Sequence, residues 1–310
     1  MNFPDLLARN NLILMEGGTT ERIRRDPGLC LDGQVGVSSL LLDRAGQEAL
    51  GSILAGYIRI GQESGLPMII GAPTWRAGRD RCRAAGLEER DLNLRGVDFA
   101  LGLKRGLGDY AAKVIVAGYL ACCGDAYDPG QALDSGEAEE YHSWQARRLA
   151  RAGADLLFAA TLPAASEALG LARAMAATST PYLLSFIIRP SGELLDGTPL
   201  DRVMDRIDRE ADPAPACYMV NCVHPGALAQ ALEARPGLAS RLAGIQANTS
   251  DKPPEDLDGS AETETMDPDE FARAMLELHS SQGIKILGGC CGTDDRHIRA
   301  LADLARGAAA

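Results

Sequence analysis

Eight short apolar runs, each followed by a longer segment with helical spacing, dominate this sequence of 310 residues. Several runs are apolar at nearly every position, which is typical of strands that are covered on both faces. Eight strands that alternate with helices fit either a closed barrel or an open doubly wound sheet. The runs are residues 12–15, 68–70, 113–119, 155–160, 182–188, 217–223, 242–247 and 284–287.

The segments between these runs carry helix signals. Segment 137–152 begins with acids and ends with arginines, which suits the helix dipole. Asp267 followed by Pro268 predicts a capped helix start. The polar segments 124–136 and 249–265 are expected to be loops. The expected helices are 47–64, 80–107, 137–152, 164–177, 199–210, 225–234, 267–282 and 294–304.

The positions of the chemically active residues favour the closed barrel. The first run leads into Glu16-Gly17-Gly18, which lacks the G-x-G-x-x-G spacing of a dinucleotide site. Other candidate side chains follow the sixth and eighth runs, and in a closed barrel those strand ends converge on one face. We therefore predict a single (β/α)8 TIM barrel over residues 1–310, with its site at the C-terminal face of the strands.

The charge and hydropathy of the chain indicate which kinds of molecule it is not expected to bind. The net charge of −12 argues against nucleic acid or anionic membrane, because both reward clustered Lys and Arg. Residues 1–10 lack the features of a signal peptide, and no run approaches the roughly 20 apolar residues of a membrane span. We expect a cytoplasmic protein whose 8 cysteines are thiols, metal ligands or catalytic groups rather than disulfides. The oligomeric state does not follow from the sequence.

The strongest motif is a Gly-Gly-Cys-Cys-Gly segment that contains Cys290 and Cys291 and directly follows the last apolar run. The glycines let the backbone turn so that both sulfurs reach one point. A metal needs a further ligand, and the best candidate is Cys222, at the end of the sixth run. Three thiolates form a soft site that suits zinc. They leave the fourth position open, as in catalytic zinc sites, and a thiol that enters it loses its proton readily.

Other cysteines and histidines are weaker candidates. The pair Cys122-Cys123 lacks glycines on both sides, and we interpret it as structural. His224 lies two residues past Cys222, but a proline follows it and ends the strand. His297 is expected to cap or pack within a helix.

These motifs resemble those of the homocysteine S-methyltransferase family, and the resemblance covers nearly the whole chain. Residues 15–20 are similar to the acidic-Gly-Gly opening of the family, and residues 74–77 to its Thr-aromatic-x-Ala segment. Asn221-Cys222 and residues 288–293 match its zinc motifs. The resemblance implies an enzyme in which Cys222, Cys290 and Cys291 hold zinc. Homocysteine would bind there through its thiol and take a methyl group from a small-molecule donor, giving methionine.

The resemblance also implies contacts with the amino-acid part of the substrate. Glu16 would hold the ammonium group. The backbone at Gly17 and Gly18, together with Thr74, would receive the carboxylate. Asn221 would support the site beside Cys222.

One position departs from the family pattern. Family members carry a Glu near the end of the fourth strand that helps to bind the amino group, and Ala160 stands there in this chain. Glu167 lies about two helical turns further on and is not expected to reach. Loss of a carboxylate from a partly desolvated ammonium site costs about 2–5 kcal/mol if nothing replaces it.

Several functions therefore remain open. The leading one is methyl transfer to homocysteine, with S-methylmethionine, S-adenosylmethionine, a betaine or another onium compound as donor. A second keeps the zinc chemistry but uses a thiol without an α-amino group. A third is a zinc-binding barrel without catalysis, and a fourth is a dithiol redox protein that uses Cys290 and Cys291.

Overall fold

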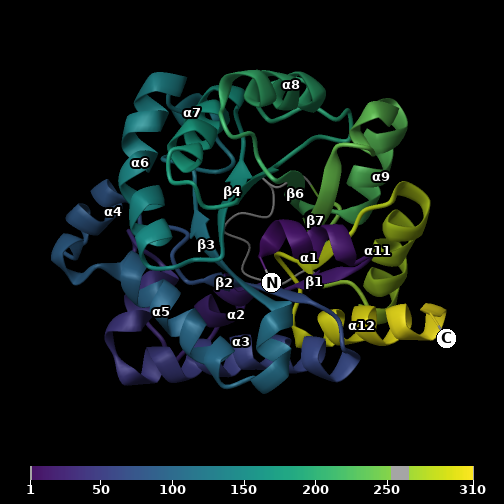
Figure 1. Cartoon of the computed structure of the whole chain (residues 1–310), viewed down its shortest axis with the longest axis horizontal. Helices are drawn as coiled ribbons and strands as arrows, with labels where there is room; N and C mark the ends of the chain where they lie inside the picture. The colour runs from purple at the N-terminus through teal and green to yellow at the C-terminus, as the bar shows by residue number, and fades with distance from the viewer. Residues whose placement is uncertain (1, 253–264, 310) are drawn as a thin grey trace.

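The computed structural model describes residues 2–252 and 265–309. Within these residues, eight parallel strands close into a barrel in chain order, with β8 paired to β1 (Figure 1). Helices surround the barrel, so the predicted (β/α)8 fold is confirmed. The strands are β1 (Ile13–Met15), β2 (Met68–Ala72), β3 (Val114–Leu120), β4 (Leu156–Leu162), β5 (Tyr182–Phe186), β6 (Cys217–Val223), β7 (Leu242–Ala247) and β8 (Ile286–Gly289).

The helices follow the predicted alternation. Segment 80–107, expected to hold a helix and an excursion, forms two helices, and Gly86, with a φ of 69°, lies just after the first of them. Asp267 caps its helix as predicted, because its carboxylate accepts from the N–H groups of Asp269 and Glu270. The described helices are α1 (Phe3–Arg9), α2 (Thr19–Arg24), α3 (Arg44–Ser64), α4 (Arg79–Ala84), α5 (Leu92–Arg105), α6 (Ser135–Arg151), α7 (Ala165–Ala176), α8 (Leu200–Glu210), α9 (Pro225–Ala234), α11 (Pro268–Gln282) and α12 (Asp295–Ala309).

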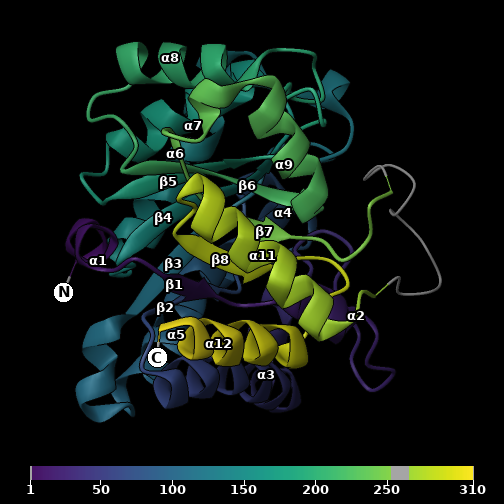
Figure 2. The same cartoon turned by 90° about the vertical axis from the view of Figure 1, so that its right-hand side faces the viewer.

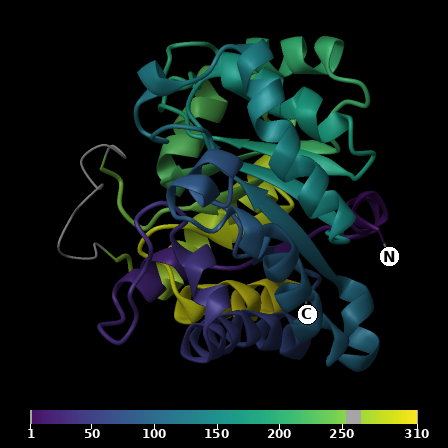
Figure 3. The ribbon, with the colours of Figure 1, turned by 90° about the vertical axis from the view of Figure 1, so that its left-hand side faces the viewer.

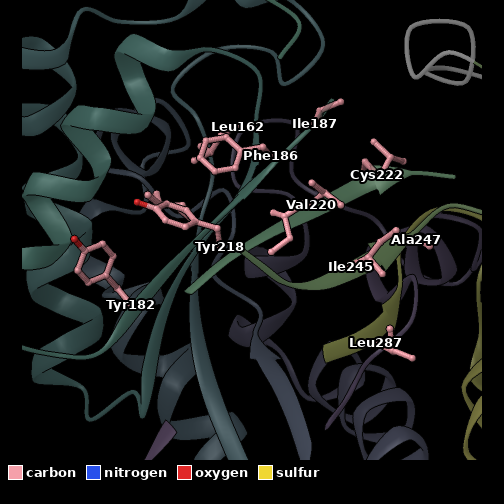
Figure 4. Packing of buried hydrophobic residues seen from close by; sticks show 14 of the residues in the cluster. Leu162, Tyr182, Phe186, Ile187, Tyr218, Val220, Cys222, Ile245, Ala247 and Leu287 are labelled. Carbon is pink, nitrogen blue, oxygen red and sulfur yellow. The ribbon is translucent and has the colours of Figure 1, made fainter. Parts of the chain in front are cut away.

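The core has two layers because side chains alternate between the faces of each strand. In β5, Leu183 belongs to the cluster inside the barrel, whereas Leu184 and Phe186 belong to the layer between the barrel and the helices. Figure 4 shows part of this outer layer, with Tyr218 and Val220 on β6 near Phe186. All of these side chains are buried. The two layers fix which strand residues face the barrel interior.

The two ends of the barrel differ. Helix α1 lies across one end, and its buried Phe3 and Leu6 pack into the interior cluster (Figures 1 and 2). Helix α2 lies at the opposite end, where the chain leaves β1 (Figures 2 and 3). Neither helix was among those expected from the sequence, because 7 and 6 residues are too few to show a helical period. The end near α2 is the C-terminal face of the strands and remains available for a site.

In the described part of the chain, no helix combines the length and apolarity that crossing a membrane requires.

Candidate metal centre

Three cysteine sulfurs meet at the C-terminal face of the barrel. Cys222 comes from the end of β6, and Cys290 and Cys291 come from the loop after β8. All three Sγ atoms lie within 4.8 Å of one another, and those of Cys222 and Cys290 are 2.7 Å apart. Tetrahedral zinc with Zn–S bonds of about 2.3 Å would separate its sulfurs by about 3.8 Å, which is within this spread. The structure thus brings together the three cysteines that the sequence singled out.

The backbone of Cys222 departs from regular strand geometry. Its φ is 55°, in the left-handed region that non-glycine residues rarely occupy. The pairing of β6 with β7 also shifts register between Asn221 and Val223. Cys222 still belongs to the outer layer with Val220, and it lies near the end of β6 (Figure 4). Such local strain is common at functional sites.

The loop that carries Cys290 and Cys291 is held by backbone contacts that only small residues permit. A Cβ on Gly289 would collide with Oγ1 of Thr293, and one on Gly18 would lie 2.5 Å from the carbonyl oxygen of Cys290. The Thr293 hydroxyl donates to that same carbonyl at 2.7 Å and accepts from Gly18 N–H at 3.0 Å. The segment after β1 therefore braces the cysteine loop.

Two further side chains fix this loop and escaped the sequence reasoning. Asn248 accepts from the N–H of Cys291 at 3.1 Å, and Glu21 accepts from the N–H of Gly292 at 2.5 Å. Asn248 directly follows β7, so its position at a strand end was a usable signal. Glu21 lies in α2, which the sequence did not reveal.

The three thiols do not ionise independently. Hydrogen bonds from Cys222 and Cys290 hold the pKa of Cys291 well below its ordinary value. The pKa of Cys290 lies well above its ordinary value, because its thiol donates to Cys222 and Cys291 and because it is buried. Without a cation, the cluster therefore favours one thiolate rather than three. A divalent metal supplies the charge that three thiolates require, so the donor set fits a bound cation.

Glu16 follows β1 and is buried at the same face, with 6% of its surface exposed. Its Oε2 accepts from Gly71 N–H at 3.1 Å, and its carboxyl also pairs with the Tyr119 hydroxyl. Burial raises the pKa of Glu16 to about 8, although the hydrogen bonds from Gly71 and Tyr119 oppose this shift. A neutral carboxyl that becomes ionised when a cation arrives is suited to binding an ammonium group.

Two donors predicted for the substrate carboxylate have partners within the protein. Gly18 N–H points to Thr293. The Thr74 hydroxyl donates to the carbonyl of Tyr119 at 2.9 Å and accepts from its N–H at 3.0 Å. Gly17 lies against Tyr57, whose hydroxyl would be 2.7 Å from a Cβ at that position. Substrate contacts by these residues stay predictions, and Gly18 and Thr74 would have to exchange partners to make them.

Asn221 connects β6 to β4. Its Oδ1 accepts from Thr161 N–H at 2.9 Å, and its Nδ2 donates to the Thr161 hydroxyl at 3.0 Å. Thr161 has a φ of 65°, which is costly for a β-branched residue. Asn221 therefore supports a strained position beside Cys222, and any direct contact with substrate stays a prediction.

We expect Asn221→Ala to lower the free energy of unfolding by about 2–3 kcal/mol, because it leaves the buried Thr161 N–H without an acceptor. Urea denaturation measures the loss. Adding Thr161→Gly should recover part of it, since glycine adopts a φ of 65° without strain. Unchanged stability of Asn221→Ala would show that the bridge is dispensable.

A family model described as homocysteine S-methyltransferase matches residues 13–305. The chain belongs to this family. Homocysteine S-methyltransferase YbgG of Bacillus subtilis is 26% identical over 224 residues, which are 71% of this chain and 65% of that protein. The chain thus matches slightly less than two thirds of the length of this relative.

Solved structures of the homocysteine methyltransferase MmuM from Escherichia coli share the fold. Its metallated form has a TM-score of 0.76 and 22% identity, with 97% of this chain and 98% of that chain covered. Its oxidized form has a TM-score of 0.77 and 22% identity, with coverages of 98% and 100%.

The departure from the family pattern that the sequence predicts falls at Ala160. This residue lies on β4 and belongs to the interior cluster, with 5% of its surface exposed. Glu167 is buried in α7, where Oε1 accepts from Cys123 N–H at 2.6 Å and pairs with Nε2 of His142 at 2.8 Å. Glu167 is thus engaged with the loop after β3 and with α6.

The remaining candidates have structural roles in this member of the family. The group that could hold a metal ion among the described residues consists of the three cysteines and includes neither His224 nor His297. His224 caps α9, because its Nδ1 accepts from Gly226 N–H at 3.1 Å. His297 packs edge-to-face on Phe271 and accepts from the N–H of Asp294, as expected. The Cys122-Cys123 pair lies outside the three-sulfur group.

Proposed function

We propose that this chain is a zinc-dependent S-methyltransferase that transfers a methyl group from a small-molecule donor to homocysteine, giving methionine. The convergence of Cys222, Cys290 and Cys291 at the C-terminal face of the barrel carries this proposal. Three sulfur ligands with an open fourth position are the arrangement of a catalytic zinc site. When bound, zinc supplies the charge that keeps a coordinated acceptor thiol deprotonated at neutral pH.

The residues of the chain would position the acceptor around that sulfur. Glu16 would receive the ammonium group and release its own proton as it does so, because its pKa of about 8 keeps the free carboxyl largely protonated. The acceptor sulfur would form a bond to the methyl carbon of the donor while the bond from that carbon to the donor heteroatom breaks, and the heteroatom would leave with the electron pair of the broken bond. Family membership supports homocysteine as the acceptor.

Isothermal titration of zinc-loaded protein with L-homocysteine tests the proposal, together with methionine formation from S-methylmethionine, S-adenosylmethionine or betaine. We expect binding that releases protons, and turnover with one of these donors. Absence of binding at a full equivalent of zinc would exclude homocysteine. Binding without turnover by any onium donor would favour a barrel that has lost catalysis.

Tyr127, in the loop after β3, provides a more specific prediction. Its hydroxyl hydrogen-bonds to the sulfur of Cys222, and its ring packs against the cluster that contains this cysteine. Removal of a polar group that contacts a metal ligand typically weakens metal binding by about 10–100-fold. We expect Tyr127→Phe to lower zinc affinity by about 10-fold in competition with a chromophoric chelator. Equal affinities would mean that the hydroxyl does not act on the ligand.

The proposed partners are therefore a small-molecule thiol and a methyl donor. A reducing cytoplasm, as predicted from the sequence, would keep the three ligand thiols available for metal. The net charge of −12 is the ground for expecting neither nucleic acid nor anionic membrane as a partner.

A further inference from the structure

Two polar side chains near the C-terminal end of the barrel interior lack hydrogen-bond partners among the described residues. They are the hydroxyl of Ser185, a residue with 0% exposed surface, and the indole N–H of Trp75. Most buried polar groups in proteins are paired, because an unpaired one loses its hydration without compensation. Unpaired donors at the end of the barrel where the three cysteines meet are therefore candidates for pairing with a ligand.

The strand pattern places Ser185 beside Ala160. Ser185 is two residues after Leu183, so it shares the inward face of β5 with this member of the interior cluster. Leu184 pairs with Ala159 of β4 and Phe186 pairs with Leu162, so Ser185 lies opposite the bulge formed by Ala160 and Thr161. The hydroxyl thus adjoins the position where family members carry the Glu that binds the amino group.

Trp75 reaches the same cluster from the loop after β2. Its side chain packs against the interior residues that include Phe158 and Ala160. The indole nitrogen only donates hydrogen bonds, so its partner must be an acceptor. A carboxylate satisfies this requirement and an ammonium group does not.

The length of the acceptor is compatible with this location. Ser185 is in register with Met219 of β6, three residues before Cys222, and three residues of strand span about 10 Å. Homocysteine has three carbons between its sulfur and its carboxylate carbon. The three carbons of homocysteine, together with two Zn–S bonds of about 2.3 Å, cover a comparable distance.

Two of the three other donors proposed for the carboxylate are less available. Gly18 N–H and the Thr74 hydroxyl already have partners in the protein. At the β4 position, Ala160 contributes no negative charge that would repel a carboxylate. We propose that the carboxylate of the acceptor thiol, rather than its ammonium group, lies beside Ala160, where Ser185 and Trp75 donate hydrogen bonds to it.

This inference rests on the proposed methyl transfer to a thiol and specifies the class of acceptor. Recognition depends on the thiol and the carboxylate, so thiols that lack an α-amino group, such as 4-mercaptobutyrate, are also acceptors. An ω-thiol amine without a carboxylate loses the contacts with Ser185 and Trp75.

Titration of zinc-loaded protein with three thiols of equal spacer length tests the assignment. The thiols are L-homocysteine, 4-mercaptobutyrate and 3-mercaptopropylamine. A hydrogen bond to a charged group contributes about 1.5–3 kcal/mol, which corresponds to roughly 10–100-fold in affinity. We expect Ser185→Ala to weaken binding of both carboxylates by at least about 10-fold and to leave the amine unchanged. Trp75→Phe should give the same pattern.

Thermal unfolding provides a second readout. Ser185→Ala should raise the Tm of the unliganded protein, because it removes a buried hydroxyl that has no partner. Ser166→Ala is the matched control, since the Ser166 hydroxyl donates to the carbonyl of Leu133 at 2.8 Å. That control should lower the Tm and leave binding of all three thiols unchanged.

Two outcomes would overturn the assignment. One is wild-type affinity of Ser185→Ala for both carboxylates, and the other is a loss confined to 3-mercaptopropylamine. The test does not depend on turnover. If the wild-type enzyme binds these thiols but methylates none of them, the proposed function fails, while the comparison of the variants still decides where the carboxylate lies.

Discussion

Replacement of Cys290 by alanine should abolish zinc retention and methyl transfer together. Cys290 contributes one of three sulfurs that lie within 4.8 Å of one another, so its loss leaves two protein ligands. Changes that only touch a metal ligand already cost about 10–100-fold in affinity or activity, and loss of a ligand itself should exceed that range. We expect less than one equivalent of zinc after dialysis and a rate reduced by more than about 100-fold.

Cys123→Ser is the matched control. Cys123 also belongs to an adjacent cysteine pair, but it lies outside the three-sulfur group and contacts Tyr141. This variant should retain a full equivalent of zinc by atomic absorption. Full activity of Cys290→Ala after removal of zinc by a chelator would contradict the assigned centre and favour chemistry that does not use a metal.

Glu16→Gln should make the protein more stable at alkaline pH and a poorer binder of homocysteine. The pKa of Glu16 is raised from 4.5 to about 8 in the folded protein, mainly by burial. Between these values the unfolded chain loses the proton while the folded protein retains it, so the free energy of unfolding falls as pH rises. A shift of this size corresponds to about 4–5 kcal/mol across the interval, and above pH 8 the loss is complete. Glutamine does not titrate and avoids this loss.

Urea unfolding of both proteins at pH 5 and pH 8 measures the effect. The advantage of Glu16→Gln should grow by several kcal/mol between the two conditions. Homocysteine affinity should fall because the ammonium loses its carboxylate, while 4-mercaptobutyrate, which has no ammonium, provides the control. Parallel pH profiles for the two proteins would mean that Glu16 is not held in a neutral state by burial.

The sequence predicts the barrel because apolar runs at regular intervals specify strands. The pair of thiols between glycines suggested a metal site with the distant Cys222, and the resemblance to the family was needed to prefer this interpretation over an incidental pair. The surrounding contacts depend on tertiary register. No local pattern places Tyr127 on Cys222, and the position of Asn248 after a strand does not show that it accepts from the N–H of Cys291. The sequence also suggested Thr74 as a carboxylate donor, and only the fold revealed that its hydroxyl bridges to Tyr119.

The strained backbone conformations could not be predicted from the sequence either. The left-handed conformations of Thr161 and Cys222 arise where the pairings of β4 and β6 with their neighbours shift register. Neither threonine nor cysteine is a residue type that favours a positive φ. The unpaired hydroxyl of Ser185 likewise requires knowledge of what surrounds it in space. Sequence patterns thus locate the chemistry, whereas the recognition of the acceptor emerges from packing.

The contacts between the first βα segment and the cysteine loop determine when the three-cysteine centre can form during folding. The hydrogen bond from Gly18 to Thr293 spans 275 residues, and that from Gly292 to Glu21 spans 271. Contacts so distant in the chain form late in folding, because the long loop must close first. A nascent chain on the ribosome therefore cannot assemble this centre before its last strand has emerged. Zinc uptake during refolding, followed with a chromophoric chelator, reports the moment at which the two ends of the polypeptide meet.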